Sequence, residues 1–510
     1  MVKDSKSIID ILHKVFDVNK YRLRESNPQV PLMYGLPKIH KTGDKMRKIV
    51  SCVNSPFEKP AKWLMSEMKK FGRFEGFSVE NSFEFIEKVK DIELTEDEIL
   101  ISFDVTALFP SVPVNVALDA IKEHLQKSNV SIEHTNAYIL AIETCMKYNC
   151  FQFRNTYYSN DFGCSMGNSL SPYIAEAFMC KLEREMKDEE IFPRIWWRYV
   201  DDTFAVVKKS DVERVLNLIN SRHSSIKFTY ELENALDHTL SFLDLKIKRF
   251  GSKIQFDVYR KPTTTDRYIT HDSYCSYQNK IASFNSMIYR MCRLPLSVAD
   301  YKNEYEHILH LAQVNGYKKS LIDQLIKKHT QRIKKKNCST LFSQNAENIN
   351  TDRRVALPFV PKICNQLKHT FSKANLTIVN SNKNKLSSSL GSSKDAKPMN
   401  KKSGIYEINC STCSSKYIGQ TKRAVECRIA EHQRYINNKD IQKAVAAHAF
   451  DLTHTEPHNM TPLLDNYKLI KSVPLPSKLD AYESIYMSIT ENLMNIEESP
   501  ITSNLFALAK

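Results

Sequence analysis

Residues 196–207 read WWRYVDDTFAVV, in which two aspartates stand between two runs of aromatic and β-branched residues. Two such runs joined by a two-residue break are typical of a β-hairpin. Asn-Gly or Asp-Gly would turn the chain more easily than Asp201-Asp202 does. Either the two carboxylates form a solvated turn, or they hold a metal ion.

A third aspartate lies upstream in similar surroundings. Residues 98–109 (EILISFDVTALF) read as a strand with Asp104 towards its end. Because adjacent strands bring distant positions together, Asp104 could lie beside the hairpin. Carboxylates at the edge of a rigid sheet suit Mg²⁺, and two such ions can clamp the attacking and leaving oxygens in nucleotide addition. The three aspartates could form such a metal site, with the solvated turn as the alternative.

The flanking sequence predicts the other elements of this domain. Helical spacing covers 114–126, 168–186 and 211–221, and strand-like runs cover 226–233, 240–247 and 254–262. This interleaving predicts an α+β domain with an antiparallel sheet. Residues 275–345 then become helical and basic, and residues 381–403 are rich in Ser, Lys and Asn, which is typical of a linker.

The 510-residue chain has a formal net charge of +15, which favours a polyanionic partner, nucleic acid first and an anionic membrane second. No segment approaches the roughly 18 uninterrupted apolar residues of a membrane span, and the N-terminus lacks the apolar run of a signal peptide. We therefore expect a soluble, intracellular protein without a membrane partner. Most of its twelve cysteines are scattered singly, as thiols in a reducing compartment are.

A second group of polar residues lies near the C-terminus. Residues 404–419 read GIYEINCSTCSSKYIG, which predicts a hairpin that brings Tyr406 and Tyr417 together. Arg428 and His432 follow one helical turn apart and so share a helix face; Glu483 comes much later. A base to activate water, an arginine to neutralise a phosphate and a carboxylate to hold one metal ion suit phosphodiester hydrolysis. Taken singly, each tyrosine could equally be a core residue.

Seven segments stand in the order and at the spacing of one known family. They are YGLPKIHK (34–41), RKIVSCVNSP (47–56), SFDVTALFPSVP (102–113), MGNSLSPYIAE (166–176), YVDD (199–202), SFLDL (241–245) and VYRKPTTTDRYI (258–269). Over about residues 30–300 the chain thus resembles a Penelope-like retroelement reverse transcriptase. The resemblance implies that Asp104 and Asp201 bind two Mg²⁺ ions, with Asp202 either a third ligand or a residue that shapes the turn.

The same resemblance implies a nucleotide-binding set. Arg47, with Lys38 and Lys41, would meet the incoming triphosphate, since a guanidinium suits phosphate. Phe109 would stand against the ribose 2′-hydroxyl, and Gly167 would lie in the turn that approaches the nascent base pair. The alternatives are a solvated loop for the lysines and plain core for Phe109. The chain departs from the pattern at Met166, where retroviral enzymes have Gln, and at 168–169, where many relatives have Ser-Pro.

Residues 404–495 resemble the GIY-YIG endonucleases. The resemblance implies that Tyr406 or Tyr417 assists the attacking water, that Arg428 contacts the scissile phosphate and that Glu483 binds one Mg²⁺. His432 would tune the tyrosine or aid proton transfer. Either Asn492 or Asn495 would complete the site.

The Penelope version of this nuclease inserts a cysteine pair between the two tripeptides and adds histidines downstream. Cys410 and Cys413 match the pair, and His448 and His454 are the candidate histidines, with His458 as a spare. Two Cys and two His could close a tetrahedral structural Zn²⁺ site. The alternative is two free thiols in a loop.

The predicted fold is therefore α+β: a right-hand polymerase followed by a small α+β GIY-YIG nuclease. The expected parts are fingers and N-terminal region (1–100), palm with an antiparallel sheet (101–265), helical thumb (266–345), connector and flexible linker (346–403) and nuclease (404–510). The predicted function is RNA-directed DNA synthesis joined to DNA nicking, in target-primed retrotransposition in the nucleus. Its partners would be the element RNA, target DNA and primer, and deoxynucleoside triphosphates.

Two other functions fit the same residues. One is a catalytically inactive nucleic-acid-binding remnant, and the other is an active nuclease that carries a dead polymerase. The family usually has more sequence before YGLPKIHK, which implies an N-terminal truncation here.

Overall fold

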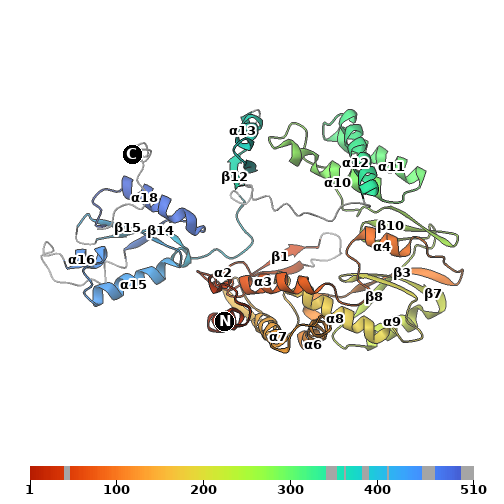
Figure 1. Ribbon diagram of the computed structural model, residues 1–510, viewed down its shortest axis with the longest axis horizontal. Coiled ribbons are helices and arrows are strands. Elements are labelled where there is room, and N and C mark those ends of the chain that lie inside the picture. Colours follow the sequence, from red (N-terminus) through yellow and green to blue (C-terminus); the bar gives the residue numbers. More distant parts are fainter. Residues whose placement is uncertain are drawn as a thin grey trace.

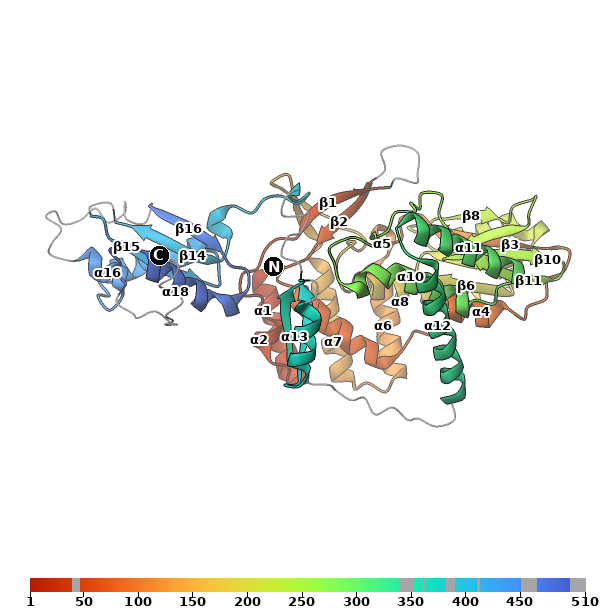
Figure 2. The same ribbon diagram turned by 90° about the horizontal axis from the view of Figure 1, so that it is seen from above.

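The computed structural model describes residues 1–38, 46–339, 353–360, 363–381, 390–410, 413–450 and 466–495. The predicted candidates Lys41, His454 and His458 lie outside these residues. The chain is elongated, with a C-terminal unit at one end and the aspartate-bearing sheet towards the other (Figures 1 and 2). No helix in the described ranges is long and apolar enough to cross a membrane.

The sheet that carries the three aspartates has four antiparallel strands in the order β6-β7-β3-β8. They are β3 (Glu98–Val105), β6 (Ile195–Tyr199), β7 (Asp202–Lys208) and β8 (Phe228–Leu232). The predicted hairpin, the strand before it and the antiparallel sheet are thus confirmed. The sequence reads as strands here because both faces of the sheet are buried, which gives near-continuous apolar runs such as FAVV (204–207).

One face of this sheet packs on helices and the other on a second small sheet. Phe103 and Ala205 belong to the larger core with α5 (Leu108–Ser111), α6 (Val114–Lys127), α8 (Ser171–Met186) and α9 (Val212–Ser221). Leu100 and Phe204 face α4 (Ser82–Val89) and the strands β9 (Thr239–Phe242), β10 (Leu245–Phe250) and β11 (Lys253–Val258). The sheet is therefore held rigidly from both sides.

The N-terminal region combines helices with a sheet of order β2-β1-β4-β5. Its helices are α1 (Val2–Phe16), α2 (Lys20–Leu23), α3 (Glu58–Met68) and α7 (Ile132–Lys147), and its strands are β1 (Leu32–Pro37), β2 (Met46–Ser51), β4 (Cys150–Phe153) and β5 (Thr156–Ser159). Strands from two distant parts of the chain thus share one sheet.

Three helices follow the second small sheet: α10 (Tyr277–Arg293), α11 (Val298–Val314) and the basic α12 (Lys319–Ser339). They pack around their own core, which includes Phe284 and Ile308. Beyond them, β12 (Arg353–Pro358) and β13 (Leu376–Ser381) pair in parallel, with α13 (Ile363–Ser372) between them in sequence.

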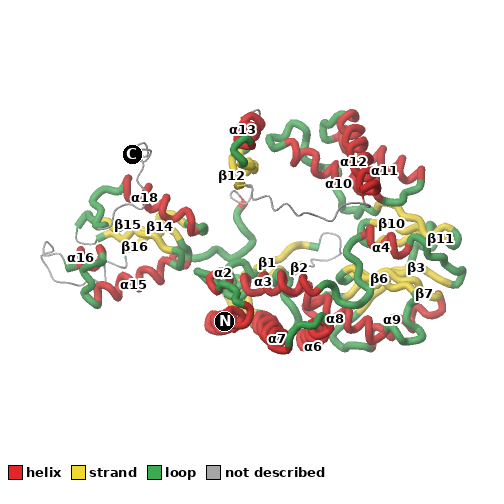
Figure 3. Tube along the Cα trace, in the orientation of Figure 1, coloured by secondary structure: helices red, strands yellow, loops and turns green. Residues whose placement is uncertain are grey.

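The C-terminal unit is a three-stranded antiparallel sheet flanked by helices (Figure 3). Its strands are β14 (Gly404–Asn409), β15 (Lys416–Thr421) and β16 (Tyr467–Ser472), and its helices are α15 (Val425–Asn437), α16 (Ala444–Ala449) and α18 (Leu479–Ile489). The predicted hairpin over 404–419 is confirmed as β14 and β15. The helix predicted to carry Arg428 and His432 is confirmed as α15.

Candidate functional site

The three aspartates meet at one end of the β3–β7 pair. The strand register sets Asp104 directly opposite Asp202, and the backbone N–H of Val105 donates to the carbonyl of Asp201 over 3.3 Å. Residues opposite each other in an antiparallel pair have Cβ atoms about 5 Å apart, and like charges there are destabilising.

The turn between β6 and β7 is strained. Val200 has φ of +59°, and 38% of its surface is exposed. A β-branched residue in the left-handed region is a true outlier that costs on the order of 1–3 kcal/mol, and such strain collects at functional sites. The strain and the opposed carboxylates together favour a functional reading of this hairpin.

A buried ion-pair network between β6 and α8 holds this turn in place. Arg198, on β6, is fully buried and contacts two carboxylates of α8: Glu183 through Nε at 2.6 Å and Glu176 through Nη1 at 2.8 Å. The same Nη1 donates to the carbonyl of Val200 over 3.1 Å. Trp196 adds a hydrogen bond from Nε1 to Glu183 at 3.0 Å. Arg198 therefore ties the strained turn to the long helix beneath the sheet.

Sequence reasoning missed this network, although a signal was present. Arg198 interrupts an apolar strand, and Glu183 falls on the buried face of a helix. Fully buried charges are rare unless they are paired. Two opposite charges at positions predicted to be buried could have been matched to each other.

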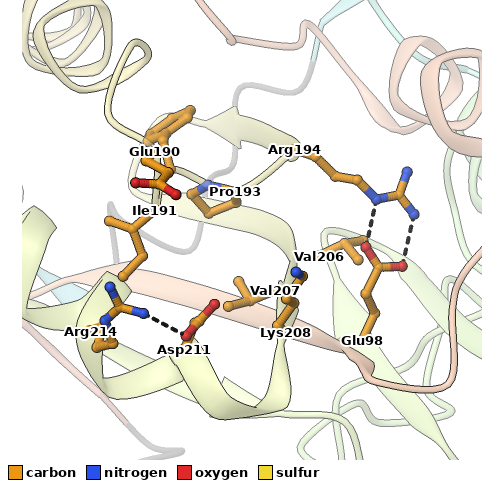
Figure 4. Close-up of a pocket in the computed structure, with 11 residues that line it drawn as sticks. Glu98, Glu190, Ile191, Pro193, Arg194, Val206, Val207, Lys208, Asp211 and Arg214 are labelled. Carbon is orange, nitrogen blue, oxygen red and sulfur yellow. Dashed lines mark hydrogen bonds and ion pairs between the residues drawn. The ribbon is translucent and has the colours of Figure 1, made fainter.

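A hollow at the far end of β3 and β7 contains none of the predicted site residues (Figure 4). Glu98, at the start of β3, accepts two hydrogen bonds from Arg194, at 2.6 and 2.8 Å. The Arg194 hydrogen bonds lower the pKa of Glu98 to about 2. Six strand positions separate Glu98 from Asp104, or about 20 Å. The hollow therefore contains an ion pair whose two charges compensate each other, and it lies far from the aspartates.

The predicted triphosphate-binding residues lie on or beside the β1–β2 hairpin. Arg47 is exposed on β2, opposite Leu36 of β1. Lys38 directly follows β1 and is partly exposed. Both side chains are thus accessible on the same hairpin.

Phe109 and Gly167 occupy constrained positions next to the aspartate sheet. Phe109 is half-buried against the larger core, and its carbonyl accepts a hydrogen bond from the Cys164 N–H at 2.7 Å. Gly167 has φ of +121°, and a Cβ there would lie 2.2 Å from the carbonyl oxygen of Val50. The close approach of β2 alone therefore requires glycine at 167, whatever base pair lies nearby.

In the C-terminal unit, Tyr406 and His432 are buried and form a cluster with the partly buried Tyr417. The hydroxyl of Tyr406 lies 2.7 Å from Nε2 of His432, and the Tyr417 and His432 ring centroids are 5.2 Å apart. A Cβ on Gly419 would lie 2.5 Å from the Tyr406 hydroxyl oxygen and 2.7 Å from the Tyr417 ring. The glycine of the YIG tripeptide thus makes room for both tyrosines.

Charged groups flank this cluster. Arg428 donates to Glu431 over 2.8 Å and hydrogen-bonds Tyr406. Glu483, on α18, is half-exposed and accepts from Gln420 Nε2 over 2.8 Å. The structure therefore brings together Tyr406, Tyr417, Arg428 and His432, with Glu483 close enough to act electrostatically on Tyr406.

The two candidate asparagines have other contacts. Asn495 makes two hydrogen bonds to the backbone of Ile418, at 2.7 and 3.0 Å, and so closes the edge of β15. Asn492 has φ of +56° and donates to the Ser414 hydroxyl. Asn495 thus bonds to β15 next to Tyr417 and Asn492 bonds to the loop before β15; which of the two completes the site stays a prediction.

Because of His432, we expect the C-terminal unit to lose folding stability at low pH. Burial, with help from Arg428, lowers the pKa of His432 to about 4, against about 6.5 in an unfolded chain. The folded state thus disfavours the proton, so this stabilisation is complete above pH 6.5 and is lost as the pH falls towards 4, by about 3 kcal/mol. Calorimetry of the full chain across this range should show the loss. His432→Gln should flatten it and the exposed-site control His13→Gln should not; equal curves for both would contradict the assignment.

The cysteine pair meets one of its candidate histidines. Within the described ranges, the one group of at least three potential ligands whose atoms all lie within 4.8 Å is Cys410, Cys413 and His448. The Sγ of Cys413 lies 3.5 Å from Nε2 of His448. Tetrahedral zinc with ordinary bond lengths separates S and N ligands by about 3.6 Å, so this donor set fits the ion.

An antiparallel sheet that presents paired carboxylates at a strained hairpin is the arrangement expected of a polymerase palm. Residues 39–234 match the family model described as reverse transcriptase (RNA-dependent DNA polymerase). The chain therefore contains a reverse transcriptase domain, and its α+β architecture agrees with the predicted fold class at that level. None of the curated proteins compared with the chain matches it.

Several solved polymerases share structural similarity with the chain. Telomerase from Candida albicans, solved with a fragment of telomeric RNA, is 13% identical, with a TM-score of 0.40; the match covers 64% of this chain and 58% of that one. Telomerase from Candida tropicalis is 12% identical, with a TM-score of 0.36, covering 61% and 59%. The Sicinivirus RNA-dependent RNA polymerase is 13% identical, with a TM-score of 0.36, covering 64% and 71%. The chain spans less than two thirds of the telomerases it matches.

Proposed function

We propose that the chain is an RNA-directed DNA polymerase with its active site at Asp104, Asp201 and Asp202. The observation that carries this proposal is the register that opposes Asp104 and Asp202 beside a strained turn, within the segment matched by the reverse transcriptase family. Such a charge pair costs stability, so a function that uses both carboxylates explains its presence better than a turn does.

The donor set suits Mg²⁺, which prefers carboxylate oxygens and generally serves reverse transcriptases. When bound, two such ions stabilise the attacking and leaving oxygens of nucleotide addition. Asp104 and Asp201 would hold them, with Asp202 as third ligand or turn residue. Arg47 and Lys38 would orient the triphosphate of the incoming deoxynucleotide, and Phe109 would stand against its ribose. The basic helix α12 would grip the RNA template and DNA primer through their backbones.

We also propose that the C-terminal unit is a GIY-YIG endonuclease of the Penelope-like type. The Tyr406–His432 hydrogen bond, with Arg428 beside it, supports this assignment. His432 with a pKa of about 4 is neutral at physiological pH, so its Nε2 can accept a hydrogen bond from the Tyr406 hydroxyl while Tyr406 or Tyr417 assists the attacking water. Arg428 would neutralise the phosphate, and Glu483 would hold one Mg²⁺. Nicking by this unit in the nucleus would expose the primer for the polymerase.

The third proposal concerns zinc at Cys410, Cys413 and His448, with His454 as the fourth ligand. Cys413→Ser should remove the bound zinc and lower the thermal stability of the C-terminal unit, because the remaining donors cannot close a tetrahedral site. Metal analysis of the purified chain measures the content directly. Cys427→Ser, at an exposed cysteine of α15, is the matched control. Equal zinc in both variants, or none in the parent, would leave the two thiols free instead.

One experiment tests both activities. A supercoiled plasmid and an RNA template are incubated with the chain, Mg²⁺ and labelled deoxynucleotides, and DNA-linked product is measured. The parent should nick the plasmid and then extend the exposed 3′-hydroxyl. The Glu483→Gln variant should no longer nick the plasmid but should still extend the 3′-hydroxyl of a plasmid that was nicked beforehand. If the parent extends nothing with Mg²⁺ or Mn²⁺, the polymerase proposal fails and the nuclease-only alternative gains. If Glu483→Gln nicks at the parental rate, the nuclease assignment fails.

A further inference from the structure

The segment just before the C-terminal unit is anchored along the N-terminal sheet. Asp395 accepts hydrogen bonds from the backbone N–H groups of Arg154 and Asn155, at 3.1 and 2.9 Å, in the turn between β4 and β5. Lys394 donates to the Ser51 hydroxyl at 2.8 Å. Further along, Asn27 donates to the carbonyl of Lys401 at 3.3 Å. We call residues 394–401 the strap.

A cleft of about 210 Å³ lies where the strap joins the two units. The N-terminal region contributes Glu25, Ser26, Asn27 and Asn54 to its lining. The strap and the C-terminal unit contribute Lys397, Lys402, Ser403, Lys422 and residues 472–474, 476 and 479. Apart from one acid, the side chains able to make polar contacts are ammonium, amide and hydroxyl groups, all of which can donate hydrogen bonds.

The positive charge of this cleft is compensated only in part from within. None of Lys397, Lys402 and Lys422 forms an ion pair with a carboxylate in the part of the chain that the structure describes. The single acid, Glu25, is engaged elsewhere, since it pairs with Lys59 at 3.1 Å and accepts from the Ser26 N–H at 3.0 Å.

The lysines also act on one another. Burial lowers the pKa of Lys397, Glu25 opposes this shift, and Lys402 adds to it by a smaller amount than Glu25 removes. Two ammonium groups near enough to repel are stabilised by an anion between them. The three ammonium groups outnumber the one carboxylate of the lining, so the cleft favours an anionic ligand.

We propose that this cleft binds the phosphate backbone of duplex DNA that extends from the nuclease unit towards the polymerase. The assignment rests on the proposed function, because that function makes DNA the ligand common to both flanking units. Lysines bind phosphate as point charges without reading sequence, so the contact would serve any target.

The test is equilibrium binding of a fluorescein-labelled nicked DNA duplex in EDTA, measured by anisotropy over a range of salt concentrations. The triple variant Lys397→Gln, Lys402→Gln, Lys422→Gln should bind more weakly than the parent. Its slope of log K against log[salt] should be shallower by about 2 to 3, because each lost phosphate contact removes about 0.9. The matched control carries Lys187→Gln, Lys208→Gln and Lys253→Gln, three exposed lysines of the palm region, and should keep the parental slope.

The following outcomes would overturn or support the proposed DNA-binding role of the cleft. An unchanged slope in the triple variant, or an equal change in the control, overturns the proposal. A slope change with duplex RNA but not with duplex DNA also overturns it. Charge-preserving Lys397→Arg, Lys402→Arg, Lys422→Arg should restore binding, which separates lost charge from misfolding. Because the assay involves no turnover, it stands even if the chain neither nicks nor extends, whereas extension of a short annealed primer, independent of this cleft, reports the polymerase proposal separately.

Discussion

Asp104→Asn should abolish primer extension on an RNA template while leaving the free energy of unfolding within about 1 kcal/mol of the parent value. The carboxylate lies half-exposed at the end of β3, so the change removes no core packing. A metal clamp contributes several kcal/mol to the transition state, and the rate should fall by about a thousandfold or more. Single-nucleotide extension with Mg²⁺, together with urea unfolding, measures both quantities.

The control for this variant is Asp188→Asn, which neutralises an exposed aspartate just beyond α8 and should extend normally. Asp201→Asn should match Asp104→Asn. The resemblance ranks Asp202 lower, yet the register opposes Asp202 to Asp104. Asp202→Asn with a loss as large as that of Asp201→Asn would make Asp202 a full ligand. Extension by Asp104→Asn at the parental rate would remove the polymerase site altogether.

Arg198→Met should lower the free energy of unfolding of the reverse transcriptase domain by about 3–5 kcal/mol. The substitution leaves the fully buried carboxylate of Glu183 without the guanidinium group whose Nε lies 2.6 Å away. It also removes the hydrogen bond to Val200 that holds the strained turn. Fluorescence of the adjacent Trp196 and Trp197 during urea unfolding reports on this region.

We assign Arg198 a positioning role at the active site. Kinetic measurements can distinguish this role from a purely structural one. At a temperature where the variant is still folded, kcat for extension should fall while KM for the deoxynucleotide stays near the parental value. Arg214→Met breaks an exposed ion pair with Asp211 and should change stability by no more than about 1 kcal/mol. Parental kcat in folded Arg198→Met would mean that the network only stabilises the fold.

Local patterns predicted much of this fold. The apolar runs around Asp104 and the hairpin at 199–202 predicted antiparallel strands, and the GIY and YIG runs predicted a second hairpin; both are present because these runs are buried in the folded chain. The pairing of Arg428 and His432 on one helix face followed in the same way from the helical period. Candidate residues on one short segment are therefore placed well by sequence alone.

Partners from distant segments could not be predicted in this way. The contact of Arg198 with Glu176 and Glu183 depends on how α8 packs beneath β6, and no local period encodes that packing. The requirement for glycine at 167 comes from Val50, on a strand far away in the sequence. Likewise, the Ser-, Lys- and Asn-rich composition before the C-terminal unit predicts a linker but carries no sign that Asp395 caps a distant turn.

The strap has a geometric consequence. Lys402 and Ser403 alone separate its last anchored carbonyl from the first residue of β14, and two extended residues span at most about 7 Å. So short a tether holds the C-terminal unit at a nearly fixed distance from the strap. If both units act on one DNA, the interval between the cut and the first copied nucleotide would be a fixed dimension of the protein, and glycines inserted directly after Lys402 would lengthen that interval step by step.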